Sequence, residues 1–192
     1  MTNFLDRCKI LSGSMLKVIA LVAMVIDHLA YTLVDYFPIL EDPLFCIGST
    51  EITLFFIMRR IGRLAFPIFA FLTVEGYFHT GNLRKYVGRL LLFAILSEIP
   101  FNLAMGSRIF YPVHQNVLWS FLISIGLIHL NETVKRKKSI WKSVLAGLIT
   151  VLLGYISGLV TMVDFYHAGV LTVLVFYFFR QKKWWSRGIP VS

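Results

Sequence analysis

The chain has 192 residues, of which 57% are hydrophobic and only 15% charged, and its formal net charge is +9. Soluble domains carry closer to a quarter charged residues, so a surface this poor in charge suits lipid better than water. The composition therefore excludes an ordinary soluble domain, and the length fits one domain. The basic balance alone would also suit a nucleic-acid-binding protein, so the positions of the cations must decide.

Apolar stretches divide the chain into about six predicted membrane-spanning helices. Ser14 suits the N-cap of the first helix, and Pro38 is expected to end it. The second stretch is long and interrupted by arginines, with Pro67 as the expected kink. The predicted spans are residues 14–37, 50–78, 89–105, 116–130, 143–163 and 168–179.

The cations are distributed unevenly between the two sides of this topology. With the N-terminus in the cytoplasm, the inner segments hold 15 of the 19 Lys and Arg residues, and the outer loops hold only Arg108. Cytoplasmic loops of membrane proteins are enriched in Lys and Arg for insertion reasons alone. The sequence therefore predicts an all-α, multi-pass protein of the cell membrane, folded as one bundle with both termini cytoplasmic. No nucleic-acid partner is needed to explain its charge.

Asp27 and His28 lie deep in the first predicted span, where polar groups are costly in hydrocarbon. One interpretation is that they only hydrogen-bond neighbouring helices. The other is general acid–base catalysis, because imidazole takes up and returns a proton near neutral pH. Adjacent helix positions point about 100° apart, so Asp27 need not be the partner of His28.

Three arginines, Arg59, Arg60 and Arg63, lie inside the second predicted span. They could extend to the outer interface, or they could bind a phosphate- or carboxylate-bearing ligand, which guanidinium recognises bidentately. A third interpretation is a structural ion pair with Asp27 or Glu98.

Helix rise allows these groups to meet. His28 lies about 20 Å above the inner start of the first span, and the arginines lie about 14–20 Å below the outer start of the second. Glu98 lies roughly 14 Å up the third span, with Asn102 one turn further out. We therefore predict one intramembrane chamber that contains His28, the arginines, Glu98 and Asn102. Other polar residues flank it, with Glu75 nearer the inner end and Asn116 and Asp164 at the outer rim.

Other motifs are less informative. Gly154 and Gly158 form a small-xxx-small pair, which predicts close helix packing. The basic run 135–138 is interpreted as a topology determinant, which could also attract anionic lipid or a cofactor's phosphates. The sequence has no Cys/His zinc pattern, no phosphate-binding glycine loop and no nucleophile elbow, so no metal is expected.

Several motifs, in this order along the chain, resemble the TraX family. They cover most of residues 15 to 130, and the resemblance is thinner afterwards, where Asp164-Phe-Tyr-His-Ala-Gly169 is similar to a family Asp-Tyr-Gly element in altered order. The motifs are Asp27-His28, the stretch 61–77 followed by His79-Thr80, Tyr86 with Arg89-Leu-Leu, Ser97-Glu98-Ile-Pro100-Phe-Asn102, and Gln115-Asn116-Val.

The resemblance implies a single transmembrane acyltransferase-like domain over residues 1–192. It groups the chain with the acyltransferase-3 proteins and the lysosomal heparan-α-glucosaminide N-acetyltransferase. The implied activity is transfer of an acetyl group from acetyl-CoA to an amine or hydroxyl, and the family's namesake acetylates the amino terminus of conjugative pilin. Acyltransferase-3 proteins carry a basic residue and a His eleven positions apart in their first helix, and Lys17 and His28 have this spacing.

The resemblance and the residue analysis together assign roles. His28 is the expected catalytic base, oriented by Asp27 or Glu98, and the expected partners are acetyl-CoA, an unidentified acceptor and the bilayer; a homodimer is allowed. The rival predictions are a small transport subunit that binds an anionic small molecule and a structural assembly factor. The expected substrate- and cofactor-binding residues are Lys17, Arg59, Arg60, Arg63, Glu75, Glu98, Asn102, Asn116 and Asp164.

Overall fold

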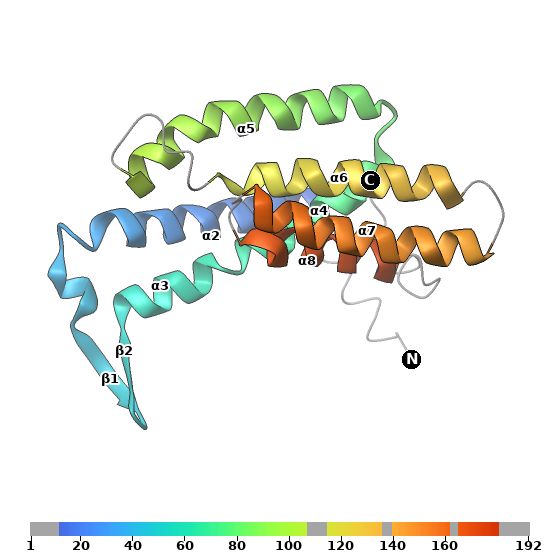
Figure 1. The fold of residues 1–192 in the computed structure, drawn as a ribbon. Helices are drawn as coiled ribbons and strands as arrows, with labels where there is room; N and C mark the ends of the chain where they lie inside the picture. The colour runs from blue at the N-terminus through green and yellow to red at the C-terminus, as the bar shows by residue number, and fades with distance from the viewer. Residues whose placement is uncertain (1–11, 107–114, 136–139, 162–164, 181–192) are drawn as a thin grey trace, which may run out of the picture. The chain divides into compact units, whose positions relative to one another are not determined.

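The computed structural model describes residues 12–106, 115–135, 140–161 and 165–180. These residues are mostly helical and form two compact units, the described residues up to Leu72 and the described residues from Thr73 on; helix α4 crosses the boundary. The elements in chain order are α2 (Gly13–Leu33), η2 (Pro38–Glu41), β1 (Pro43–Ile47), β2 (Thr50–Thr53), α3 (Leu54–Gly62), α4 (Ala65–His79), α5 (Leu83–Gly106), α6 (Val117–Lys135), α7 (Ile140–Val160) and α8 (Tyr166–Arg180) (Figure 1).

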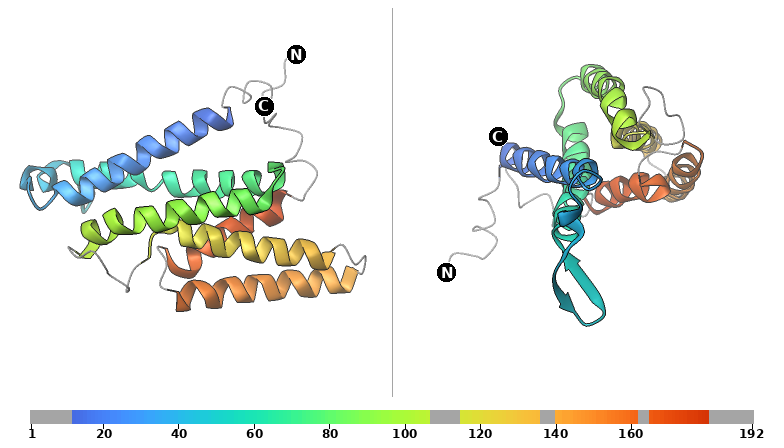
Figure 2. Two further views of the ribbon diagram at one scale, coloured as in Figure 1. Left: turned by 90° about the horizontal axis from the view of Figure 1, so that it is seen from above. Right: turned by 90° about the vertical axis from the view of Figure 1, so that its left-hand side faces the viewer.

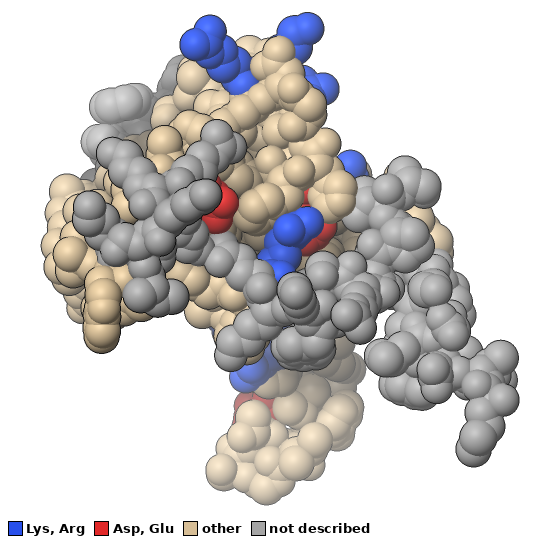
Figure 3. All heavy atoms as spheres, turned by 90° about the vertical axis from the view of Figure 1, so that its right-hand side faces the viewer, with Lys and Arg blue, Asp and Glu red and all other residues tan. Residues whose placement is uncertain are grey.

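Three of the described helices are long and apolar enough to cross a membrane, namely Gly13–Leu33, Leu83–Leu103 and Val117–Val134. A helix of this length spans about 30 Å, the thickness of the hydrocarbon core. Two shorter apolar helices, Val144–Val160 and Tyr166–Arg180, accompany them. On the face drawn in Figure 3, Lys and Arg side chains rise from a surface that is otherwise mostly uncharged. These features are those of a helical membrane protein.

In the first unit, α2 packs against α3. The N-cap of α2 is Ser12 rather than the predicted Ser14: its hydroxyl accepts a hydrogen bond from the Met15 amide at 3.2 Å. The helix ends at Leu33, several residues before the predicted end, and Pro38 instead begins the short helix η2. Small residues make α2 suitable for close packing, since its buried positions are all alanines, Ala20, Ala23 and Ala30.

The predicted second span begins with β2, the second strand of a β-hairpin whose first strand precedes the span, so the prediction of a purely α-helical chain is wrong here. Strands β1 and β2 pair antiparallel, with Phe45 opposite Ile52 and Ile47 opposite Thr50. Gly48 has a φ of +63° in the tight turn, which a residue without Cβ adopts readily. The hairpin extends away from α2 and α3 (Figures 1 and 2). Alternating β-branched and aromatic residues favour strands over a helix start.

The rest of the predicted second span is divided into α3 and α4. Thr53 caps α3, because its hydroxyl accepts a hydrogen bond from the Phe56 amide at 3.0 Å. The predicted break is confirmed, but it lies at Arg63 and Leu64 rather than at Pro67. Pro67 falls in the first turn of α4, where no intrahelical partner is needed for the amide hydrogen that proline lacks.

In the second unit, α6, α7 and α8 pack against one another, and α5 packs against α6 (Figures 1 and 2). A Cβ added at Gly154 would lie 2.8 Å from Leu174 Cδ1, and one at Gly158 would overlap the backbone of His167. The predicted packing role of the two glycines is therefore confirmed. The unit's core includes Ile128, Val170, Val173, Leu174 and Tyr177.

Candidate functional site

An ion pair joins the two helices of the first unit. Arg59 Nη1 on α3 donates to Asp27 Oδ2 on α2 at 2.5 Å, and the two side chains are 26% and 22% exposed. Gly62 makes this approach possible, since a Cβ there would overlap the Asp27 side chain. Of the three interpretations of the arginines, internal pairing with Asp27 holds for Arg59. The second carboxylate oxygen, Asp27 Oδ1, is buried and has no hydrogen-bond partner among the described residues.

His28 is oriented by the backbone and not by Asp27. Its Nδ1 lies 2.8 Å from the Met24 carbonyl oxygen, one turn earlier in α2. A carbonyl can only accept, so Nδ1 carries the proton and the neutral ring keeps its lone pair on Nε2. The carboxylate that was expected to orient His28 is instead paired with Arg59. The exposed imidazole nevertheless presents a basic nitrogen from a fixed tautomer.

Arg60 and Arg63 remain available. Both are exposed, and no ion pair joins either to a carboxylate within the described part of the chain. The Arg60 guanidinium lies 4.7 Å from the centre of the Phe56 ring, while Arg63 caps the C-terminus of α3. Lys17 is also exposed; eleven residues before His28, it lies on the same face of α2, about 16 Å away.

A second polar cluster forms around Glu98 in the other unit. Glu98 Oε2 accepts hydrogen bonds from Trp119 Nε1 at 3.0 Å and from the Asn116 side-chain amide. Asn116 also donates to the Ala94 carbonyl at 2.8 Å and caps α6. The carboxylate thus lies at the N-terminal end of α6, where the helix dipole is positive. Asn102, only 2% exposed, lies one turn further along α5, so three predicted residues share one region.

Glu75 belongs to a network that sequence reasoning missed. Arg180 Nε on α8 donates to Glu75 Oε1 at 2.6 Å, and His79 Nδ1 lies 3.3 Å from Oε2. Arg180 also lies over the Phe78 ring, 4.2 Å from its centre. Phe78 stacks on Tyr177, whose hydroxyl donates to Glu132 at 2.6 Å and accepts from Asn131 at 2.9 Å. The only sequence signal was polar residues at the ends of apolar helices.

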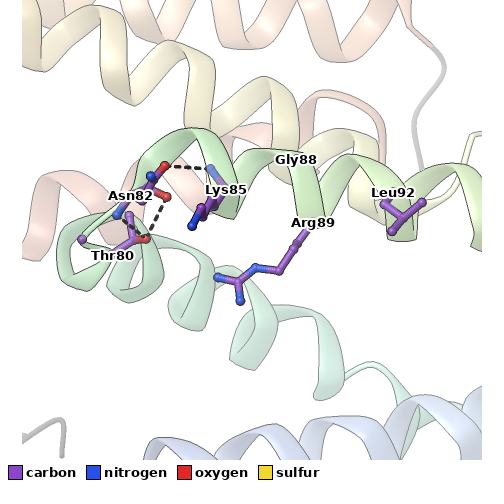
Figure 4. A pocket seen from close by; sticks show the side chains of 7 residues that line it. Thr80, Asn82, Lys85, Gly88, Arg89 and Leu92 are labelled. Atoms are coloured by element: carbon purple, nitrogen blue, oxygen red, sulfur yellow. Dashed lines mark hydrogen bonds between the residues drawn. The ribbon is translucent and has the colours of Figure 1, made fainter.

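A depression of about 630 Å³ opens along the first turns of α5 (Figure 4). Its cations are Lys85, which was interpreted from sequence as a topology determinant, and Arg89, which was interpreted in the same way and also as part of the TraX-like motif with Tyr86. Asn82 caps the helix by accepting a hydrogen bond from the Lys85 amide at 3.0 Å. The lining residues are Thr80, Gly81, Asn82, Lys85, Gly88, Arg89 and Leu92.

Some predicted features are not tested. Asp164 lies outside the described residues. The predicted chamber combines residues of both units, and it stays a prediction. Within the ranges that the structure describes, no three His, Cys, Asp or Glu residues form a group that could hold a metal ion.

Long apolar helices and, among the described residues, both an ion pair and arginines without a carboxylate partner define a helical membrane protein with charged groups beside its apolar helices. The chain belongs to the TraX family, because the model of that family, described as TraX protein, matches residues 12–192. It is also similar to the probable fimbrial assembly protein FimC, serogroup H1, of Dichelobacter nodosus. The two are 40% identical over 87 residues, which cover 45% of this chain and 30% of that protein. No solved structure matches.

Proposed function

We propose that the protein is an integral membrane acetyltransferase that transfers the acetyl group of acetyl-CoA to an amine or hydroxyl. The observation that carries this proposal is His28, whose Nδ1 is held by the Met24 carbonyl, which leaves the lone pair of the ring on Nε2. Within the proposal the chain has six spans in one bundle, with both termini in the cytoplasm of the cell that carries it. It belongs, on this view, to the transmembrane acyltransferase superfamily.

The proposed reaction begins when the acceptor nitrogen or oxygen attacks the carbonyl carbon of acetyl-CoA. His28 Nε2 removes the proton from the acceptor as the new bond forms. The carbon–sulfur bond then breaks, and CoA leaves as a thiolate that takes the proton back from the imidazolium. In a variant of this scheme, Nε2 carries the acetyl group between the two substrates.

Arg60 and Arg63 supply positive charge in this scheme. Either guanidinium can stabilise the oxyanion that develops on the acetyl carbonyl, or bind an anionic group of a substrate. Asp27 takes a positioning role, because its ion pair with Arg59 fixes α3 against α2 and so fixes the other two arginines relative to His28. This replaces the predicted role of Asp27 as the partner of His28.

The acceptor is the least defined part of the proposal. The similar protein FimC is described as a probable fimbrial assembly protein. A synthetic peptide that carries the amino terminus of a fimbrial subunit is therefore the first acceptor to try. A hydroxyl-bearing saccharide is the second, since an alcohol can be acylated by the same base.

The direct test compares wild type with His28→Ala, purified in nanodiscs and supplied with radiolabelled acetyl-CoA. Removing a general base should lower the transfer rate by about 10²–10⁴-fold. Thr32→Val is a matched control on the same exposed surface of α2, and it should keep the wild-type rate. Equal thermal stability of His28→Ala and Thr32→Val excludes misfolding as the cause of a lower rate. A wild-type rate in His28→Ala would falsify the assignment of His28 as the base.

The second candidate is a transport subunit that binds an anionic small molecule, and the two exposed arginines without a described carboxylate partner favour it. Ligand binding raises the free energy of unfolding by an amount that grows with the logarithm of ligand concentration over Kd, so a binding ligand raises thermal stability. An acetyltransferase should be stabilised by acetyl-CoA and CoA but not by unrelated nucleotides. A transport subunit should be stabilised by neither acetyl-CoA nor CoA. It should lose binding of its own anionic ligand in Arg60→Gln and Arg63→Gln.

A further inference from the structure

The depression on α5 has a lining that suits an anion. Lys85, Gly88, Arg89 and Leu92 recur at steps of three and four residues, so they form one face of the helix. Figure 4 shows this face, with Thr80 and Asn82 at its start and Leu92 at its far end. No carboxylate lines the depression. Two cations therefore share a hollow in which no described residue neutralises them.

The spacing of Lys85 and Arg89 favours the binding of an external anion. Lys85 and Arg89 are exposed and four residues apart, a spacing at which like charges repel and weaken a helix. Among the described residues no ion pair involves either of them. A guanidinium offers a planar pair of donors to a phosphate, and a nearby ammonium adds a point charge. The start of α5 adds a weaker field of the same sign.

The shape of the hollow says more about the ligand. A Cβ added at Gly81 or Gly88 would meet nothing within 4 Å, so both glycines border open space. The lining passes from the polar turn at Thr80 to the apolar, 54% exposed Leu92. A free inorganic ion would use only the polar end. The hollow therefore fits a phosphate attached to a longer, less polar body.

We propose that this depression binds the phosphate group of such a molecule, through Lys85 and Arg89. Two molecules share this chemistry, the head of a phospholipid and CoA. If CoA is the source, the inference rests on the proposed acetyl transfer and locates the phosphate end of the donor. If a phospholipid is the source, the site stands independently of any reaction.

The test measures the thermal stabilisation of the full chain in detergent by four probes. CoA is compared with pantetheine, which lacks phosphate, and short-chain phosphatidylglycerol with the matching diacylglycerol. The variants are Lys85→Gln with Arg89→Gln, and Gly88→Leu, which fills the hollow without changing charge. The matched controls are Arg84→Gln, an exposed cation of the same turn outside the lining, and Gly126→Leu, whose added side chain also meets open space.

The Lys85→Gln, Arg89→Gln variant should weaken binding of at least one phosphate-bearing probe by about tenfold or more, since each lost charged contact is large on this scale. Gly88→Leu should weaken binding of the same probe because its side chain occupies the hollow. Both controls should bind as wild type does, and the phosphate-free probes should not respond. The responding arm, CoA or phosphatidylglycerol, identifies the source. Unchanged binding in the site variants, or an equal loss in Arg84→Gln, would overturn the proposal.

The acetyl-transfer assay separates this inference from the proposed function. If CoA is the source, the Lys85→Gln, Arg89→Gln double variant should raise the KM for acetyl-CoA and leave kcat near wild type. Wild type that binds CoA through this hollow but transfers no acetyl would keep the site and reject the reaction. Transfer with an unchanged KM, together with no response in the lipid arm, would reject the site and keep the reaction.

Discussion

Two arginine–carboxylate pairs of nearly equal length differ in what surrounds them. Arg59 and Asp27 join α2 to α3 at 2.5 Å, and Arg180 and Glu75 join α8 to α4 at 2.6 Å. In the second pair the other carboxylate oxygen faces His79, and Arg180 lies 4.2 Å from the centre of the Phe78 ring, whereas Arg59 of the first pair lies 5.7 Å from the centre of the Tyr31 ring. In the first pair Asp27 Oδ1 is buried without a hydrogen-bond partner among the described residues.

The difference distinguishes two roles. Arg180 and Glu75 form a structural clamp, which stabilises the fold, and Arg59 and Asp27 belong to a reactive region beside His28. A buried polar atom without a partner costs about 1–3 kcal/mol, so a fold tends to keep one only where something else uses it. The Glu75 network connects three helices, and both carboxylate oxygens of Glu75 face a cation or an imidazole, although Asn131 Oδ1 in this network is also buried without a hydrogen-bond partner among the described residues. The Asp27 pair lies next in sequence to His28 and to two arginines without a described carboxylate partner. We therefore expect changes at Glu75 to affect stability and changes at Asp27 to affect activity.

The largest effect should come from Gly62→Leu, which removes the close contact that the first pair needs. A side chain at this position overlaps Asp27, so α3 must move and Arg59 loses its partner. Overpacking together with a broken, partly buried ion pair should lower the free energy of unfolding by about 3 kcal/mol. Thermal unfolding in detergent measures this, with Gly126→Leu as the control. A melting temperature equal to that of wild type would show that the two helices are not closely packed at Gly62.

Arg180→Gln should have the next largest effect, because it removes the positive partner of Glu75 and the contact with Phe78. Charged hydrogen bonds of this kind contribute roughly 1.5–3 kcal/mol, so we expect a loss of about 2 kcal/mol in unfolding free energy. Glu75→Gln should cost a similar amount, and the double variant should cost less than the sum of both. Strict additivity would mean that the two residues do not interact. Acetyl transfer in the folded fraction should be unchanged.

The contrast between the pairs also shows how far sequence reasoning reached. Long apolar runs predicted α2, α5 and α6, and the motifs from Asp27 to Asn116 predicted the family correctly. The hairpin was missed, because a short apolar run cannot be assigned to strand or helix by periodicity alone. Likewise, Pro67 is as compatible with the first turn of a helix as with a kink. In both places the helix does without the hydrogen bond that the missing amide hydrogen of proline would donate.

Ion-pair partners were harder to predict than elements. Internal pairing of the arginines with Asp27 was one of three open alternatives, because Arg59 is 32 residues away along the chain and only the packing at Gly62 decides between them. Arg180 is 105 residues from Glu75, and topology already explained its charge. The proposed phosphate-binding hollow was hidden for the same reason, since the predicted topology already accounted for Lys85 and Arg89. A residue assigned to topology was not considered further for a second role.

The smallest stability effect, and the sharpest test of the comparison, should come from Asp27→Asn. Asparagine keeps the shape and an oxygen that can accept from Arg59, so we expect a loss of only about 1 kcal/mol in unfolding free energy. It removes the negative charge, however, so α3 is held less firmly and the arginines shift relative to His28. The rate of acetyl transfer should fall roughly tenfold, which corresponds to 1.4 kcal/mol in the barrier. Glu75→Gln is the matched control and should show the reverse, a larger loss of stability with full activity. If both amide variants lose stability and activity in the same ratio, the two pairs have the same role and the distinction between clamp and reactive region is wrong.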